Sequence, residues 1–239
     1  MRYETEYVIV AGVAWIRRSR VETRDGRVDE SVWLVLFDGA PTAHKAPAGT
    51  STPREGAIDG IAWKLDWTAV HPSFETPHAL LRPVAPSHLV TTPAILVDGT
   101  IGDRVLERAP GHTARLWGKR HAETWGWAHA STADGRWVHL LTATAPHLPR
   151  ISQYAHNGRG PGLPFASAKV EPPVVEVGPY RVDAPLESFI GLRYLDTDGS
   201  DLWCYHSEQG HVRGGDIDLR GAALEIATRE PIAGWTVGA

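Results

Sequence analysis

The residue types best suited to moving a proton beside a positive charge are concentrated between Trp117 and His129. These thirteen residues contain three tryptophans, two histidines and the acid Glu123. Imidazoles titrate near neutrality and buried carboxyls can be brought there, so both serve as general acids or bases. Tryptophan rings attract cations to their faces, at about 0.5–2 kcal/mol per contact. The stretch therefore places candidate acid–base groups beside aromatic faces that could hold a cation.

Glu123 is the first candidate for the proton donor. Burial beside the aromatic cluster would raise the pKa of its carboxyl and keep it protonated near neutrality. The structural alternative is a surface carboxylate paired with Lys119 or Arg120, because glutamate is seldom fully buried. Both interpretations stay open from the residues alone.

Two histidines complete the predicted catalytic set. From Trp125 the residues alternate, so that Trp125, Trp127 and His129 fall on one face of a strand. His129 could act as a base or fix a water molecule, or it could be a hydrogen-bonded core histidine. His121 precedes this alternation, and residues 119–124 could form a bulge or turn that resets it. The predicted catalytic residues are Glu123, His129 and His121.

The same stretch supplies candidates for ligand binding. Trp117, Trp125 and Trp127 could hold a cation, or they could fill a core in which each indole needs one partner for its N–H. Arg115 and Arg120 could bind a carboxylate or phosphate of a ligand, or they could pair with local acids. Of these, Trp117, Trp125, Trp127 and Arg115 form the predicted ligand-binding set.

Histidine spacing argues against a metal centre. His129, His139, His206 and His211 include no pair at the helical or tight-turn spacing of zinc ligands. The glycine-rich segment 158–162 lacks the flanking strand and helix of a phosphate-binding loop. We expect neither a metal nor a cofactor.

A hairpin positions the imidazole and aromatic groups. The strand that carries His129 has glycine and alanine on its opposite face, which another layer can approach closely. Asp134-Gly135 is typical of a type I′ turn, and a strand over residues 137–144 returns from it. A two-residue turn would place His129 opposite Leu140.

Turn signals and short apolar runs predict an all-β protein. The 18 prolines and 24 glycines leave few segments free of helix breakers. Residues 7–18 predict a buried strand that returns over residues 31–37, after a turn at Asp25-Gly26. Residues 219–228 fit either a short helix or a last strand. Short strands at roughly 8–12-residue spacing indicate a sandwich or a barrel.

Residues 71–93 separate the strands into two groups. They hold five prolines and three histidines, which predicts a long irregular connection or a lid. We place the domain boundary there. An N-terminal barrel-like half covers residues 1–90, and a C-terminal half with the Trp/His motif covers residues 91–239.

Charge and cysteine content exclude several classes of protein. A net charge of −4 and a pI near 6.3 argue against binding of nucleic acid. Cys204 is the only cysteine, which excludes an internal disulfide. The acidic N-terminus is unlike a signal peptide, and the apolar run over residues 7–16 is too short for a transmembrane segment. We expect a cytoplasmic protein, and its oligomeric state stays open.

Two segments resemble a known family. Residues 111–129, with Trp-Gly-Lys-Arg-His followed by Trp-x-Trp-x-His, resemble the lipocalin-like, AttH-type proteins grouped with hydroxyneurosporene synthase (carotenoid 1,2-hydratase). Residues 202–208, Leu-Trp-Cys-Tyr-His-Ser-Glu, resemble a later strand of that group. The resemblance implies two consecutive lipocalin-like (calycin) β-barrels, at least one of them reduced in a chain of this length. Members hydrate carotenoid ends, and related folds cyclise polyenes or bind hydrophobic molecules.

The resemblance also bears on individual residues. It implies that His206, with Glu208 on the same face, meets the central cluster across a barrel, so His206 joins the predicted ligand-binding set. The hydratases tend to carry an Asp-His pair shortly before the Trp-Gly pair, where this chain has Ala114 and Arg115. This departure bears on the reaction more than on the fold.

Three functions are consistent with these features. The first is a cofactor-independent acid–base enzyme (hydratase, cyclase or isomerase), acting on an isoprenoid or polyene-like molecule in a β-barrel cavity beneath Trp125, Trp127 and His129. Glu123 or His129 would move the proton there. The second is a non-catalytic binding protein for a hydrophobic metabolite, which the absent Asp-His pair favours. The third is a scaffold whose own side chains fill the cavity.

Overall fold

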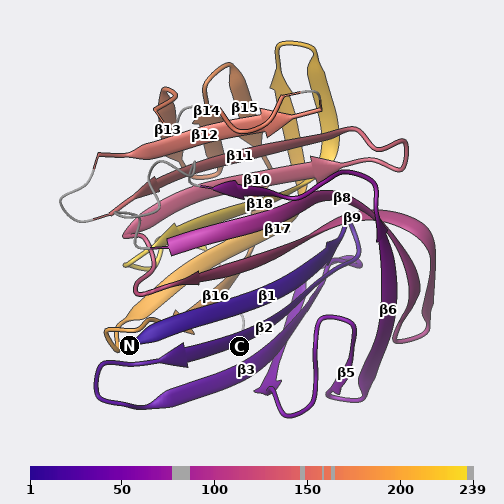
Figure 1. Cartoon of the computed structure of the whole chain (residues 1–239), viewed down its shortest axis with the longest axis vertical. Coiled ribbons are helices and arrows are strands. Elements are labelled where there is room, and N and C mark those ends of the chain that lie inside the picture. The colour runs from indigo at the N-terminus through magenta and orange to yellow at the C-terminus, as the bar shows by residue number, and fades with distance from the viewer. Residues whose placement is uncertain (77–86, 146–148, 158, 163–164, 236–239) are drawn as a thin grey trace.

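Strands dominate the structure, which is a computed structural model. It describes residues 1–76, 87–145, 149–157, 159–162 and 165–235. The chain forms two antiparallel sheets, which lie one above the other in Figure 1 and each curl into a nearly closed barrel. The single helical element among the described residues is the short 3-10 turn η2 (Leu186–Ser188). The prediction of an all-β architecture with two consecutive barrels is confirmed.

The first sheet has the order β4-β3-β2-β1-β9-β8-β6-β5, with β7 beside β8. Its strands are β1 (Arg2–Val10), β2 (Ala14–Glu22), β3 (Val28–Leu36), β4 (Thr42–Pro47), β5 (Glu55–Ile58), β6 (Ile61–Ala69), β7 (Phe74–Thr76), β8 (Ser87–Ile101) and β9 (Arg104–Gly118). Residues 7–18, predicted as one strand, instead contain the β1–β2 turn. Gly12 adopts a φ of 66° there, a conformation that glycine accepts without steric cost.

The second sheet has the order β12-β11-β10-β18-β17-β15-β14-β13, with β16 beside β17. Its strands are β10 (Thr124–Ser131), β11 (Trp137–Thr144), β12 (Ile151–His156), β13 (Ala168–Glu171), β14 (Val174–Val177), β15 (Tyr180–Asp183), β16 (Ile190–Leu195), β17 (Asp201–Gly214) and β18 (Ile217–Thr228). Residues 219–228, which fitted a helix or a strand, belong to β18.

The sheets divide between Gly118 and Thr124, later than the expected boundary at residue 90. β9 pairs with β1 and β8 pairs with β6, so both strands of this hairpin belong to the first sheet. The Trp/His motif is therefore shared between the two sheets. Within the expected lid, β7 and the start of β8 are ordered strands, and residues 77–86 lie outside the described residues.

Alternation along the strands builds a core in each barrel and a third between them. On β1, Val8 points into the first barrel and Ile9 points toward the second sheet. On β10, Ala128 points into the second barrel and Trp127 points toward the first sheet. Successive strand residues face opposite sides, so each sheet is buried on both faces here.

The face of β10 that carries glycine and alanine is in close contact with other strands. A Cβ added to Gly126 would lie 2.7 Å from Val175 Cγ2 and 3.1 Å from Val170 Cγ2. Both valines belong to the β13–β14 hairpin, which covers the second barrel. The close approach expected on this face is thus present, because glycine leaves room for it.

The register of the β10–β11 hairpin differs from the expected one by one residue. His129 faces His139 instead of Leu140. Thr132 N–H donates to the Arg136 carbonyl, so the connection is longer than the two residues Asp134-Gly135. The prediction of a two-residue turn was wrong, because Gly135 (φ 83°) closes a longer turn. As a result, two imidazoles become direct neighbours.

Candidate functional site

A cavity lies between the two barrels, against the outward faces of both sheets. Strands β1, β2, β3, β7, β8 and β9 line one side, and β10, β11, β12, β16, β17 and β18 line the other. Part of the space between its lining residues is open to solvent, and the lining is mostly apolar and aromatic, as in small-molecule pockets generally. The barrel interiors, in contrast, are filled by their own buried side chains.

Aromatic side chains form much of the cavity wall. Trp15 and Trp127, from opposite sheets, stack with ring centroids 5.9 Å apart, and Tyr7 meets both edge-on. The indole N–H groups of Trp15, Trp33 and Trp127 have no hydrogen-bond partner among the described residues. Buried indole N–H groups usually find a partner. The wall is therefore apolar with a few unsatisfied donors.

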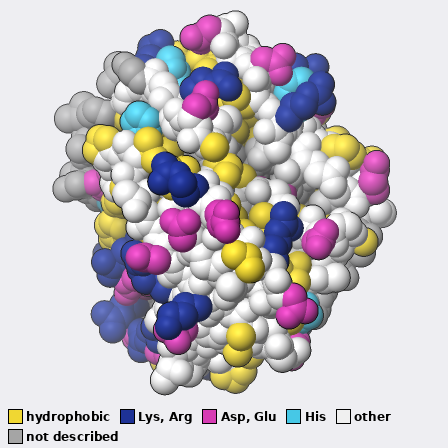
Figure 2. Space-filling model, turned by 90° about the vertical axis from the view of Figure 1, so that its right-hand side faces the viewer, with side chains coloured by type: hydrophobic (Ala, Val, Ile, Leu, Met, Phe, Trp, Pro, Cys, Tyr) yellow, Lys and Arg dark blue, Asp and Glu magenta, His cyan; other side chains and the backbone are white. Residues whose placement is uncertain are grey.

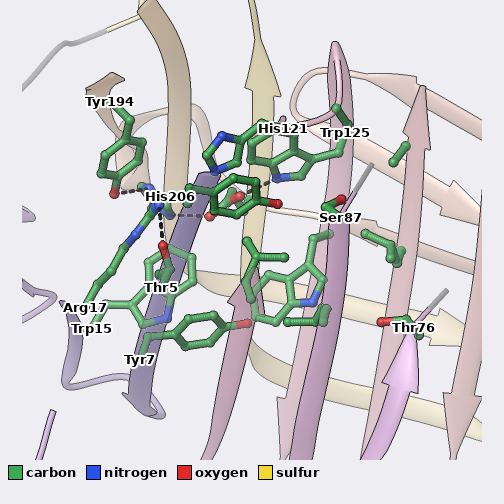
Figure 3. Close-up of a pocket in the computed structure, with 18 of the residues that line it drawn as sticks. Thr5, Tyr7, Trp15, Arg17, Thr76, Ser87, His121, Trp125, Tyr194 and His206 are labelled. Carbon is green, nitrogen blue, oxygen red and sulfur yellow. Dashed lines mark hydrogen bonds and ion pairs between the residues drawn. The ribbon is translucent and has the colours of Figure 1, made fainter. Parts of the chain in front are cut away.

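Four polar groups, centred on the Glu225 carboxyl, lie next to one another in this wall, and Figure 3 shows three of them, Trp125, His206 and Tyr194. Trp125 Nε1 donates a hydrogen bond to Glu225 Oε1, and His206 Nδ1 lies 3.2 Å from Glu225 Oε2. The Tyr194 hydroxyl lies 3.3 Å from His206 Nε2. His206 and Glu225 are direct partners in the β17–β18 register, which holds their side chains together on one face.

Burial controls the protonation of Glu225 and His206 in this group of four. Desolvation raises the pKa of Glu225, and the charge of Arg17 and the hydrogen bond from Trp125 oppose that shift. Burial also holds the pKa of His206 well below its usual range, so that this imidazole is neutral at pH 7. A neutral imidazole donates at one nitrogen and accepts at the other. Nδ1 of this uncharged imidazole thus faces Glu225, and Nε2 faces the Tyr194 hydroxyl.

Arg17 supplies a positive charge at the same end of the cavity. Its guanidinium carbon lies 4.0 Å from the centroid of the Tyr194 ring. Its Nε donates to Ser19 Oγ at 2.9 Å and its Nη2 donates to Thr5 Oγ1 at 3.4 Å. These partners are neutral hydroxyls and an aromatic face.

A second imidazole, His121, reaches the cavity from the segment between β9 and β10. Its Nδ1 lies 2.7 Å from Asp196 Oδ1, and Arg229 Nη2 lies 2.7 Å from Asp196 Oδ2. Burial would raise the pKa of Asp196, but His121, the Thr197 N–H and Arg229 together hold it well below its usual range.

The protonation state of His121 follows from these contacts. Burial lowers its pKa, although Asp196 acts in the opposite direction. A neutral His121 that donates Nδ1–H to the Asp196 carboxylate presents Nε2 as an acceptor. This nitrogen has no hydrogen-bond partner in the described part of the chain. The arrangement is that of an imidazole base oriented by a buried acid.

Two of the predicted catalytic residues lie away from the cavity lining. Glu123 pairs with Arg120 Nη2 at 2.7 Å and with Arg229 Nε at 3.3 Å, as the structural alternative for this residue anticipated. His129 is buried, and its Nε2 donates to the Pro93 carbonyl at 2.7 Å. Burial lowers the pKa of His129 to about 4, so it is neutral in the fold.

The predicted ligand-binding residues separate into two groups. Trp125, Trp127 and His206 line the cavity together with His121. Trp117 instead stacks on His88 at 5.6 Å between ring centroids. The side chain of Arg115 is exposed and forms an ion pair with Glu4.

A buried histidine cluster next to the cavity comes from neighbouring strands. The ring centroids of His112 and His129 are 3.9 Å apart, and Nδ1 of His129 lies 3.4 Å from Nδ1 of His139. Burial holds the pKa of His112 and of His139 well below the usual range. Within the described ranges, no three His, Cys, Asp or Glu side chains are grouped as metal ligands.

Sequence reasoning missed several residues of the site, Asp196 and Trp15 among them. Glu225 lies in a segment whose type of element was undecided, Arg17 lies in an apparently continuous apolar strand, and Tyr194 has no motif around it. The alternation of Ala223, Glu225 and Ala227 along a strand was a usable signal, because it places one carboxyl in an otherwise small apolar face.

Comparisons of the sequence identify relatives without a described activity. No family model matches the chain. The uncharacterised protein Rv0493c of Mycobacterium tuberculosis (strain H37Rv) is 27% identical over 193 residues, and its counterpart in strain CDC 1551 gives the same match. The alignment covers 70% of this chain and 58% of the relative, so the chain spans little more than half of that protein.

Two solved structures share the fold. A Nitrosomonas europaea protein provisionally named AttH superposes with a TM-score of 0.51 at 16% identity, over 95% of this chain and 91% of its own. Kievitone hydratase from Nectria haematococca superposes with a TM-score of 0.55 at 8% identity, over 95% and 88%. At these identities the likeness concerns the fold, and it confirms the predicted AttH-type, lipocalin-like architecture.

Two further observations concern the surface charges and the helices. Figure 2 shows basic and acidic side chains interspersed over one face of the molecule, without a broad patch of one sign. In the described ranges, the structure holds no helix of the length and apolarity that crossing a membrane requires.

Proposed function

We propose that the cavity is the active site of a hydratase-like enzyme. It would add water to a carbon–carbon double bond of a hydrophobic, isoprenoid or polyene-like molecule by proton transfer alone. The observation that carries the proposal is the Glu225 carboxyl, held between Trp125 and His206 in the wall of an aromatic cavity. The reaction named in kievitone hydratase, which has the same fold, supports the reaction class.

The first step is protonation of the alkene by the Glu225 carboxylic acid. The π electron pair forms the new C–H bond, Glu225 becomes a carboxylate, and the neighbouring carbon becomes a cation. The faces of Trp15 and Trp127 stabilise that cation, at about 0.5–2 kcal/mol or more per desolvated contact. The hydrogen bond from Trp125 Nε1 stabilises the carboxylate that remains, and the His206 ring lies beside that carboxylate.

The second step is attack by water on the cation. A lone pair of the water oxygen forms the C–O bond, and the proton that water loses passes to Nε2 of His121. Asp196 orients this imidazole and stabilises the imidazolium. Return of that proton to Glu225 through solvent restores the starting state, so the balance is alkene plus water to alcohol. In this scheme the proton donor is Glu225 instead of Glu123, because Glu225 lines the cavity.

The test compares the Glu225→Gln variant with the unchanged protein. Each is incubated with a panel of isoprenoid alkenes in water enriched in heavy oxygen, and the alcohols are identified by mass spectrometry. We expect product with one heavy oxygen from the unchanged protein and a rate lower by roughly 10²–10⁴-fold in the variant, the usual contribution of a general acid. Glu123→Gln is the control and keeps its rate, because its carboxylate pairs with Arg120 and Arg229 outside the cavity lining. Equal rates for the unchanged protein and Glu225→Gln would refute the proposal.

The second candidate function is binding of a hydrophobic metabolite without turnover. The observation that favours it is the charge of Arg17, which lowers the pKa of Glu225 and so favours a carboxylate that cannot donate a proton. A binding protein would return every molecule of the panel chemically unchanged, and Trp127→Ala would weaken retention of that molecule.

A further inference from the structure

We infer that the cavity selects an amphipathic anion, whose carboxylate or phosphate is held by Arg17 and whose apolar body lies along the aromatic wall. The inference rests on the proposed function in taking this cavity as the substrate site. It adds the chemical class of the substrate, which the geometry of Glu225 leaves open.

Arg17 is a largely buried cation without a salt bridge. In the described part of the chain, its polar partners are the hydroxyls of Ser19, Thr5 and Tyr194, and its guanidinium lies over the Tyr194 ring. Arg229 shows the contrast, because it is similarly buried but pairs with two carboxylates, those of Asp196 and Glu123. A buried charge is costly unless it is paired, so the environment of Arg17 favours an added anion.

The guanidinium retains donors for such an anion. It carries five N–H groups in a planar fork, and Nε and one group of Nη2 are directed to the hydroxyls of Ser19 and Thr5. A fork of this kind binds carboxylate and phosphate with two parallel hydrogen bonds. The hydroxyls and the Tyr194 ring hold the fork in place, which reduces the entropy that binding would cost.

Glu225 is a carboxyl whose charge raises the pKa of Arg17, and the ion pairs of the described residues do not join the two side chains. Its carboxyl contacts Trp125 and His206 instead. Burial raises its pKa, so Glu225 compensates the charge of Arg17 incompletely. An anion bound at Arg17 would also remove the influence that lowers this pKa, which favours the protonated Glu225 that the first catalytic step requires.

Among the described lining residues, Arg17 is the one Lys or Arg side chain. Figure 3 shows Arg17 and Tyr194 on one side and Thr76 on the other. Strands β11 and β12 contribute apolar lining through Leu141, Ala143 and Ile151. An anionic head and an apolar body therefore match this lining.

The sequence had suggested other arginines for an anionic group. Arg115 pairs with Glu4, and Arg120 pairs with Glu123 and Asp198. Neither arginine lines the cavity. Arg17 is the residue that the fold places there, because it shares a face of β2 with Trp15.

The experiment is calorimetric titration of the full chain with three probes that share one alkyl chain: decanoate, decyl phosphate and decanol. We expect one of the anions to bind at least tenfold more tightly than decanol, and the tighter one identifies carboxylate or phosphate as the head group. In Arg17→Gln the affinity for that anion falls at least tenfold and the affinity for decanol stays within twofold. Arg17→Lys keeps the charge without the planar fork and retains part of the preference. Arg115→Gln, an exposed control, leaves all three affinities unchanged.

Three outcomes would overturn the inference. The first is equal affinity of the unchanged protein for decanol and both anions, and the second is no binding of any probe. The third is a loss of affinity in Arg17→Gln that is equal for all three probes. Thermal unfolding of each variant establishes that it is folded. These outcomes are independent of turnover. A preference for anions with no alcohol product would refute hydration alone, and alcohol formation with equal affinities would refute the role of Arg17 alone.

Discussion

Replacing Asp196 with asparagine tests the buried network that orients His121. The Asp196 side chain is 0% exposed, and it contacts His121 Nδ1 and Arg229 Nη2, each at 2.7 Å, as well as the N–H of Thr197. These partners come from the segment before β10, the end of β18 and the β16–β17 turn. One carboxylate thus connects three parts of the chain beside the cavity.

The expected loss of unfolding free energy in Asp196→Asn follows from the burial of the Asp196–Arg229 ion pair. Removing one partner of a buried ion pair costs about 3–5 kcal/mol, since the other charge is left uncompensated. Arg229 keeps Glu123 as a second partner at 3.3 Å, and asparagine keeps the shape of the side chain, so we expect the lower end, about 3 kcal/mol. For a chain of this size that loss lowers the Tm by about 6–12 °C.

The pH dependence provides an independent check. The folded-state pKa of Asp196 lies well below its usual value, so its stabilisation is complete above the unfolded pKa of about 3.9 and disappears as the pH falls through the folded pKa. The difference in unfolding free energy between the unchanged protein and Asp196→Asn should therefore be full at pH 7 and smaller at pH 3.

The assay is urea unfolding followed by tryptophan fluorescence at both pH values. Asp198→Asn, two residues along the same turn, is the matched control, because its partly exposed carboxylate pairs with Arg120 at 3.3 Å. Such pairs contribute about 0–1 kcal/mol. If Asp196→Asn costs no more than Asp198→Asn at pH 7, the reasoning is refuted.

Two further predictions concern packing and protonation. Gly126→Val should destabilise the fold by about 1–3 kcal/mol, because the added Cβ would lie 2.7 Å from Val175 Cγ2. The control is Gly199→Ala, which lies at an open turn and costs only backbone strain. Equal unfolding free energies for the two variants in urea would contradict this account of the close approach. The second prediction concerns His129, whose folded pKa of about 4 lies below the unfolded 6.5, so that stability is complete above pH 6.5 and falls as the pH drops toward 4. His129→Gln should remove about 2 kcal/mol of the stability difference between pH 7 and pH 5, and unchanged pH dependence in urea titrations would show that His129 does not bind the proton.

Local patterns predicted the strands of the motif and their two faces. The alternation from Trp125 to Ser131 places tryptophans on one side, and glycine and alanine on the other, as the structure has them. The turn at Asp25-Gly26 also lies where the dipeptide indicates. Such features depend on residues close in sequence, so composition and periodicity contain them.

Local patterns could not predict the register of the β10–β11 hairpin or the boundary between the two sheets. A hairpin turn longer by a few residues moves every cross-strand partner, which is why His139 and not Leu140 faces His129. The β8–β9 hairpin begins within the proline-rich segment 71–93 and belongs mostly to the expected second half, but it joins the first sheet, because β9 pairs with β1 near the N-terminus. Pairing between strands so far apart in sequence has no local signature.

The sequence by itself determined the all-β class, the resemblance to lipocalin-like proteins, and the aromatic and imidazole character of the central strand. Only the tertiary structure decided that the cavity lies between the barrels, and that Glu225, Arg17 and Tyr194 reach it while Glu123 and His129 do not. The physical reason is that each strand has two buried faces here. Alternation shows which residues share a face, whereas the packing of one barrel on the other decides which of those faces encloses a site.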